Sequence, residues 1–205
     1  MHFVQNTVSV QLLTNVRSGN CTQNCAYCAQ SKDSQAEIEK YKRVSDEKLY
    51  GDNDLVDEKH LARHCIGLSG IGFSDEEIED LADRIREMKK KDTQICCSIG
   101  FLTEKQARIL KDAGLDRINH NLNSSRSFYP EICTTHTYDQ RVNNIKMLQS
   151  LGFEICSGGI VGMGESKEDI VDMLMDLREI NPESVPINFL LPIPGTRLAD
   201  RDISE

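Results

Sequence analysis

The sequence is organised around one stretch, CTQNCAYC at residues 21–28, which places three thiols within eight residues just after an apolar, alternating segment. Soft sulfur ligands spaced as C-x3-C-x2-C can hold one metal centre. Because no fourth cysteine lies nearby in the sequence, that centre would keep one coordination position free. Zinc sites usually take two ligand pairs separated by a longer loop, so the spacing favours an iron-sulfur cluster with one iron open to a substrate. A zinc site and structural thiols are the alternatives.

Composition and charge narrow the class of protein. The chain has 205 residues, of which 39% are hydrophobic, and this is enough for one domain with a sizeable core. Its net charge of -9 argues against nucleic-acid binding, which relies on clustered Lys and Arg. No apolar run approaches about 18 residues, so we expect no membrane span. The first 20 residues lack the pattern of a secretion signal, so we expect reduced cysteines in a cytoplasmic protein.

A strand followed by a helix repeats along the chain. Four helix starts carry a capping box or a close variant of it: Ser74 with Glu77, Thr103 with Gln106, Thr137 with Gln140, and Ser166 with Asp169. Gly114 and Gly152 stand where two helices should end, and a further helix is expected to begin near Ser45. Strands are expected at 8–15, 63–69, 94–99, 115–122, 153–158 and 184–190. The alternation predicts an α/β fold with a parallel sheet, and six units predict a TIM-type barrel or partial barrel formed by residues 1–205 as a single domain.

Residue parity separates the two faces of each expected strand, because one face packs on helices and the other faces the lumen. The outward parity is mostly apolar and includes Ile66, Cys97, Ile118, Ile155, Val185, Ile187 and Phe189. The residues expected to face the lumen include three thiols and four amides, namely Cys65, Cys96, Cys156, Asn119, Asn121, Asn123 and Asn188. A packed barrel interior prefers branched aliphatic side chains. Three inward thiols could hold a second cluster and the amides could bind two small molecules, although any one of them could also be an ordinary core residue.

Three other features receive structural interpretations. Cys133, in the connection from Pro130 to Thr137, is interpreted as a structural thiol, and His120, on the outward parity, as a hydrogen-bonded core residue. The glycine-rich segment 158–165 follows the fifth strand rather than the first, so it does not predict dinucleotide binding. Its glycines would instead let the backbone approach a ligand at the strand ends.

Six segments, taken in order, resemble those of the biotin synthases, a family within the radical S-adenosylmethionine (SAM) superfamily. They are RHC at 63–65, CCSIG at 96–100, INHNL at 118–122, CSGG at 156–159, GMGE at 162–165 and VPIN at 185–188. The C-x3-C-x2-C motif marks only the superfamily, whereas the asparagine run together with CSGG is more specific. The resemblance covers nearly the whole chain and implies a radical SAM barrel.

This resemblance implies two clusters. Cys21, Cys25 and Cys28 would hold a [4Fe-4S] cluster that binds SAM, and reductive cleavage of SAM would give a 5'-deoxyadenosyl radical. A [2Fe-2S] cluster that gives up sulfur to dethiobiotin, forming biotin, would be held by Cys65, Cys96 and Cys156.

The resemblance also implies roles for polar residues of the lumen. The SAM nucleoside would be contacted by Tyr27, Asn121 and Asn123. The ureido ring of dethiobiotin would be contacted by Asn119, Asn121 and Asn188. Many relatives carry Asp where this chain has Asn123, so the contact to the SAM ribose would be neutral here.

Partners and chain length follow from the same resemblance. It implies an electron donor such as flavodoxin or ferredoxin, iron-sulfur assembly proteins, and a homodimer. Relatives continue to strands seven and eight, and an arginine on the seventh supplies the fourth [2Fe-2S] ligand. We therefore expect a fragment or shortened relative, without strands seven and eight, that cleaves SAM but forms little or no biotin. The alternatives are a radical SAM enzyme of the cofactor-maturation or methylthiolation type, and a non-catalytic zinc-binding domain.

Overall fold

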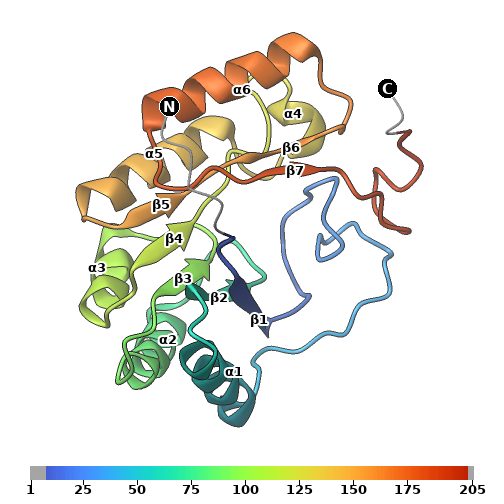
Figure 1. Cartoon of the computed structure of the whole chain (residues 1–205). Helices are drawn as coiled ribbons and strands as arrows, with labels where there is room; N and C mark the ends of the chain where they lie inside the picture. Colours follow the sequence, from blue (N-terminus) through green and yellow to red (C-terminus); the bar gives the residue numbers. More distant parts are fainter. Residues whose placement is uncertain (1–7, 203–205) are drawn as a thin grey trace.

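The computed structural model describes residues 8–202, which form an open, curved sheet with helices on its outer side (Figure 1). Five parallel strands pair in chain order: β1 (Gln11–Arg17), β2 (Arg63–Leu68), β3 (Ile95–Ser98), β4 (Arg117–Asn119) and β5 (Glu154–Cys156). A second parallel pair consists of β6 (Gly159–Val161) and β7 (Ile187–Phe189). Isolated bridges from Asn123 to Gly159 and from Cys156 to Ser184 connect this pair with the larger sheet. The expected α/β partial barrel is confirmed.

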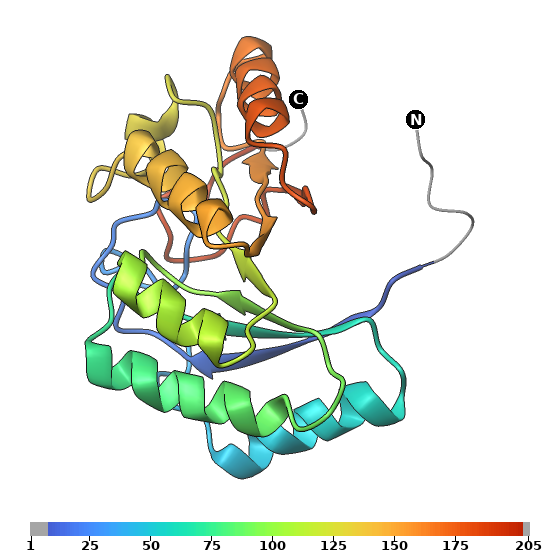
Figure 2. The ribbon, with the colours of Figure 1, turned by 90° about the vertical axis from the view of Figure 1, so that its left-hand side faces the viewer.

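The helices begin and end where short-range sequence signals place them. They are α1 (Asp46–Glu58), α2 (Asp75–Met88), α3 (Glu104–Asp112), α4 (Tyr129–Ile132), α5 (Tyr138–Ser150) and α6 (Lys167–Ile180), and Figure 2 shows α1, α2 and α3 side by side along the sheet. All four predicted capping boxes form, and Ser45 caps α1. Gly114 and Gly152 follow α3 and α5 with φ of 95° and 78°, a conformation that glycine adopts without strain.

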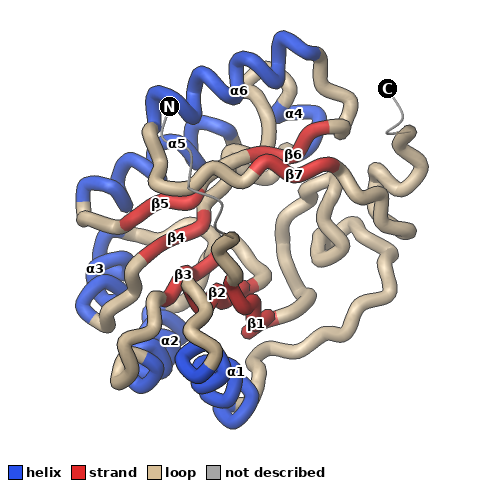
Figure 3. The backbone as a smooth tube through the Cα atoms, in the orientation of Figure 1, coloured by secondary structure: helices blue, strands red, loops and turns tan. Residues whose placement is uncertain are grey.

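The expected strand at 153–158 is shorter in the structure, where β5 pairs with β4. A separate strand, β6, follows outside the expected range and pairs with β7 (Figure 3). A Cβ at Gly158 would lie 1.8 Å from the Pro186 carbonyl oxygen, and one at Gly159 would lie 2.1 Å from Met173 Sδ. These glycines therefore let β7 and α6 approach the strand. We expected the backbone at these glycines to approach a ligand. That prediction was wrong at Gly158 and Gly159, because atoms of Pro186 and Met173 fill the space beside them.

Residue parity sorts the side chains of β2 to β5 as expected. Ile66, Cys97, Ile118 and Ile155 are fully buried against the helices and belong to the hydrophobic core. The last strand differs: the outward residues Val185, Ile187 and Phe189 are 46%, 42% and 82% exposed. The expected burial of this strand was therefore wrong.

No helix, over the part of the chain that the structure describes, combines the length and the apolar composition that crossing a membrane requires.

Candidate functional site

The loop after β1 brings the three clustered thiols around one cavity. Cys21, Cys25 and Cys28 are half-buried and line a space of about 280 Å³ inside the curve of the sheet. Three thiols that share a cavity, with space beside them, fit a cluster that keeps one iron open for a ligand.

Long-range hydrogen bonds hold this loop in place. Ala26 N donates to the Ile132 carbonyl oxygen at 2.8 Å, and Asn24 Nδ2 donates to Thr134 Oγ1 at 2.7 Å. Arg197 Nη2 donates to the carbonyl oxygens of Asn24 and Ile132, both at 3.0 Å. The thiols are therefore positioned by contacts with segments more than a hundred residues away.

The predicted cofactor- and substrate-binding side chains line the same cavity: Tyr27, Asn119, Asn121, Asn123 and Asn188. Asn121 Oδ1 accepts a hydrogen bond from Gly158 N at 3.1 Å, which leaves Nδ2 available as a donor. Asn123 is buried and has a φ of 72°, and its backbone bonds Gly158 and Ile160. Burial raises the pKa of Tyr27 well above its usual value, so this side chain stays a neutral phenol.

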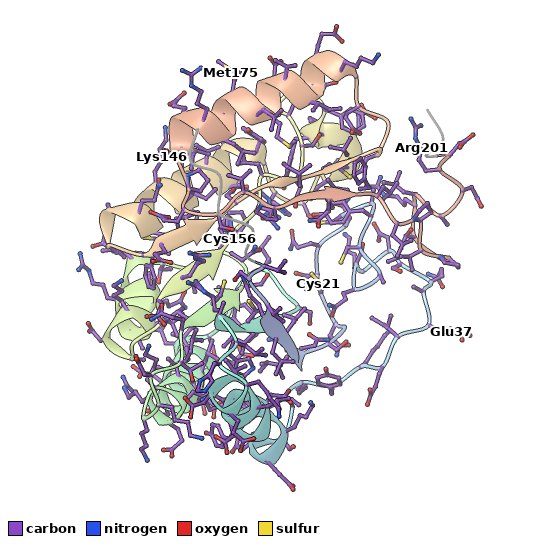
Figure 4. All side chains as sticks on the ribbon, viewed as in Figure 1. Cys21, Glu37, Lys146, Cys156, Met175 and Arg201 are labelled. Carbon is purple, nitrogen blue, oxygen red and sulfur yellow. The ribbon has the colours of Figure 1, made fainter. Side chains whose placement is uncertain are left out.

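A second cavity, of about 400 Å³, is lined by the three strand thiols Cys65, Cys96 and Cys156. Parallel pairing places Cys65 opposite Cys96, and it places Asn119 opposite Cys156. Figure 4 labels Cys156 on the sheet side of the interior and Cys21 on the loop side. The structure thus brings the predicted second set of thiols together, separately from the first set.

The two cavities share a wall formed by Ser98 and Asn119, which line both of them. Asn119 Nδ2 donates to Cys156 Sγ at 3.2 Å, and Ser98 Oγ lies 3.5 Å from Asn119 Oδ1. One amide side chain therefore touches a strand thiol and faces the cavity of the loop thiols.

Positive charge lies beside the strand thiols. Arg117 lines their cavity and donates from Nε and Nη2 to Glu154 Oε2 at 2.9 Å and 2.7 Å. A hydrogen bond from Cys96 lowers the pKa of Cys65 below its usual value, with help from the charges of Arg63 and Arg117 and against the effect of burial. The thiolate is the metal-binding form, so this environment suits a metal centre.

Three residues that were not predicted to belong to the site, Cys133, His136 and Arg141, lie near Cys25. Cys133 Sγ lies 3.8 Å from Cys25 Sγ and 3.3 Å from His136 Nδ1. Arg141 donates to His136 Nε2 at 2.9 Å, to the Asn121 carbonyl oxygen at 3.1 Å, and also to the hydroxyl of Tyr129. Cys133 is buried, as a structural thiol would be, but it belongs to the surroundings of the loop thiols. The spacing Cys133-x2-His136 is the signal that could have revealed it.

The prediction that His120 is a hydrogen-bonded core residue is confirmed only in part. Its ring is buried, lines the cavity of the loop thiols, and is hydrogen-bonded to the backbone of Ile99. Burial lowers its pKa to about 3, so the imidazole is neutral. Among the described residues, none bonds its Nε2.

Curated relatives of the chain share one activity. The chain is 42% identical to a biotin synthase of Sulfurihydrogenibium sp., over 98% of this chain and 60% of the relative. It is 44% identical to the biotin synthase of Rhodopirellula baltica, over 94% of this chain and 54% of the relative. The biotin synthase of Bacillus subtilis is 40% identical, over 96% of this chain and 59% of the relative. The chain thus spans between half and two thirds of the length of these relatives.

Solved structures show the same fold. Methylornithine synthase (PylB) superposes with a TM-score of 0.88 at 16% identity, over all of this chain and 60% of that one. The hydrogenase maturase HydG superposes with a TM-score of 0.74 at 17% identity, over 92% of this chain and 46% of that one. At such identities the likeness concerns the fold alone.

A sequence profile described as "Radical SAM superfamily" matches residues 15–177. Membership of this superfamily implies a [4Fe-4S] cluster and SAM as cofactors. A [2Fe-2S] cluster fits the biotin synthase relatives. The cavity with three half-buried thiols agrees with the first cluster. Because the profile covers most of the chain, the protein belongs to the radical SAM superfamily.

Proposed function

We propose that this chain forms the radical core of a biotin synthase, which inserts sulfur into dethiobiotin to form biotin. The observation that carries the proposal is the pair of adjoining cavities, each lined by its own three thiols and joined through Ser98 and Asn119. One set of thiols would serve any radical SAM enzyme. A second set on the strands, beside inward amides, fits a sulfur donor placed next to a polar substrate.

The first cavity is proposed to hold the [4Fe-4S] cluster on Cys21, Cys25 and Cys28. With SAM, that cluster supplies a 5'-deoxyadenosyl radical when both are bound. The side chains proposed to bind SAM are those of Tyr27, Asn121 and Asn123. Tyr27 stays neutral and can donate a hydrogen bond, and Asn121 keeps Nδ2 as a donor, so both suit the oxygen and nitrogen acceptors of a nucleoside.

The substrate is proposed to lie on Asn119, Asn121 and Asn188. A ureido ring has a carbonyl acceptor and N–H donors, and each asparagine amide offers both partners. Asn119 also bonds Cys156 Sγ at 3.2 Å, so a substrate held by this amide lies close to the strand thiols. Cys65, Cys96 and Cys156 are proposed to hold the [2Fe-2S] cluster that serves as the sulfur source.

The proposal includes the partners that this chemistry needs. Reductive cleavage of SAM consumes an electron, so a donor such as flavodoxin or ferredoxin is required. Sulfur taken from a cluster must be replaced, and iron-sulfur assembly proteins could do this. A homodimer, which the family resemblance implies, completes the proposal. A cytoplasmic location agrees with cysteines that are free thiols.

The test is a single-turnover assay of the anaerobically reconstituted chain, with iron and acid-labile sulfide measured in parallel. Cys156→Ala should keep the formation of 5'-deoxyadenosine but lose the acid-labile sulfide of the second cluster. Cys97→Ala is the matched control, because its thiol faces the helices. Unchanged sulfide content in Cys156→Ala would contradict a sulfur donor at the strand thiols.

A further inference from the structure

We propose that Cys25, Cys133 and His136 form a further metal site, distinct from the two cluster sites, which takes one thiophilic divalent cation such as zinc when the [4Fe-4S] cluster is absent. The ligand atoms of these three residues lie within 4.8 Å of one another. Cys133 and His136 are 2% and 6% exposed, and Cys25 is half-buried. This inference goes beyond sulfur insertion and does not depend on the identity of the substrate.

The distances suit a single tetrahedral ion. Two thiolates bound to one zinc ion at about 2.3 Å lie about 3.8 Å apart when the angle is tetrahedral. Cys25 Sγ and Cys133 Sγ are 3.8 Å apart. A thiolate and an imidazole nitrogen on the same ion lie about 3.5 Å apart, and Cys133 Sγ is 3.3 Å from His136 Nδ1. The thiolates of a [4Fe-4S] cluster bind different irons, so they are held farther apart than this pair.

Neighbouring polar groups orient the imidazole. His136 Nε2 lies 2.8 Å from the hydroxyl of Tyr129, and Nδ1 lies 2.9 Å from Gln23 Oε1. An imidazole that binds metal through one nitrogen usually donates from the other, and Tyr129 provides that acceptor for Nε2. Gln23 Oε1 is therefore the group beside the metal-binding nitrogen.

Binding of an ion changes which ring nitrogen of His136 carries the hydrogen. In the metal-free chain Arg141 Nη2 donates to Nε2, so the ring hydrogen is on Nδ1 and points toward Gln23 Oε1. A cation on Nδ1 moves this hydrogen to Nε2, where Tyr129 accepts it, while Arg141 keeps its bond to the Asn121 carbonyl oxygen. The thiols of Cys25 and Cys133 must lose their protons, so binding releases protons to solution.

Cys25 is shared by the two metal sites. Its thiolate can bind the cluster or the single ion, but it cannot serve both in these geometries. A zinc ion held with Cys133 and His136 therefore competes with assembly of the [4Fe-4S] cluster on the same loop.

The experiment is a titration of the metal-free, cluster-free chain with cobalt(II), followed by displacement with zinc. Tetrahedral cobalt with thiolate ligands gives charge-transfer and d–d absorption bands. Cys133→Ala and His136→Ala should each remove one tightly bound equivalent of cobalt. This loss is larger than the weakening of metal binding by about 10- to 100-fold that is typical when a residue hydrogen-bonded to a ligand is changed. Tyr129→Phe should weaken binding within that 10- to 100-fold range. Cys21→Ala is the matched control, because it removes a thiol of the same loop that lies outside the proposed site, and it should retain the bands.

Two results would overturn the proposal. If Cys21→Ala removes the bands and Cys133→Ala keeps them, the ion binds the three loop thiols instead. If Cys133→Ala cannot assemble a [4Fe-4S] cluster, although its circular dichroism matches the parent, then Cys133 is a cluster ligand rather than part of a separate site. Cys133→Ser repeats the test with a smaller perturbation of packing. Retained SAM cleavage in Cys133→Ala, together with lost cobalt binding, separates this inference from the proposed function.

Discussion

The two sets of thiols are built in opposite ways. Cys21, Cys25 and Cys28 lie within eight residues of one loop, whereas the strand thiols come from β2, β3 and β5. The strand set meets only because parallel pairing aligns those strands. A shift of β3 by one residue would turn Cys96 outward, whereas no change of strand register alters the spacing of the loop set. The comparison teaches that one site is specified by local sequence and the other by the whole sheet.

The largest expected effect is on SAM cleavage, which should depend on the loop thiols but not on the strand thiols. Cys25→Ala should abolish both the [4Fe-4S] cluster and the cleavage of SAM, because a cluster on two thiolates is not held. Cys65→Ala should leave that cleavage intact. Formation of 5'-deoxyadenosine under dithionite measures both variants. Cleavage at the parent rate in Cys25→Ala would show that the loop thiols are wrongly assigned.

The next prediction tests the dependence on sheet register. Cys96→Ala should lower the iron and acid-labile sulfide of the second cluster, while Cys97→Ala should leave them nearly unchanged. Cys96 lines the cavity of the strand thiols, and Cys97 is buried in the core against the helices. The reverse ranking would mean that the register assigned to β3 is off by one.

A smaller effect is expected at the wall between the cavities. Asn119→Ala and Asn188→Ala should each weaken dethiobiotin binding by about three- to tenfold, the value of one hydrogen bond. Asn119 alone also bonds Cys156, so only Asn119→Ala should change the visible spectrum of the second cluster. A change of equal size in Asn188→Ala would contradict a role for Asn119 as the link between the two sites.

The smallest effect lies outside both thiol sets. Asp169, at the start of α6, accepts hydrogen bonds from Ser125 and Ser127 at 2.6 Å and from Ser166 N at 2.9 Å. The bonds from these serines lower its pKa below the usual 3.8. The folded state therefore favours the carboxylate, and this stabilisation is present above the usual pKa and is lost as pH falls below it.

Urea melts of the metal-free chain at pH 5 and at pH 3 measure this effect. Asp169→Asn should reduce the difference in unfolding free energy between the two pH values. It should leave the iron content of both clusters unchanged after reconstitution at neutral pH. An unchanged pH dependence would mean that other carboxylates dominate the acid sensitivity.

Sequence reasoning succeeded where a feature depends on few positions. The four capping boxes and the stops at Gly114 and Gly152 involve residues at most three or four apart, and all of them form. Strand parity also worked for β2 to β5, because the core residues of one face are consistently apolar.

Features that depend on distant partners could not be predicted in this way. The glycines at 158 and 159 are required by Pro186 and Met173, and nothing near them in the sequence shows this. The exposure of Phe189 depends on what packs against β7. Cys133 lies beside Cys25, although the two residues are 108 positions apart in the sequence. The segment around Cys133 gives no sign of this contact, so the sequence suggested only a structural thiol.

The contact between Arg197 and the cysteine loop has a consequence for biosynthesis. Arg197 and Asn24 are 173 residues apart. At about 5 to 20 residues per second, a ribosome needs roughly 10 to 35 s to make the chain between them. During this interval the loop and Ile132 can already be joined by the bonds of Ala26 and Asn24, but the Arg197 side chain is not yet made. The last of the contacts that hold the cysteine loop therefore forms only near the end of synthesis.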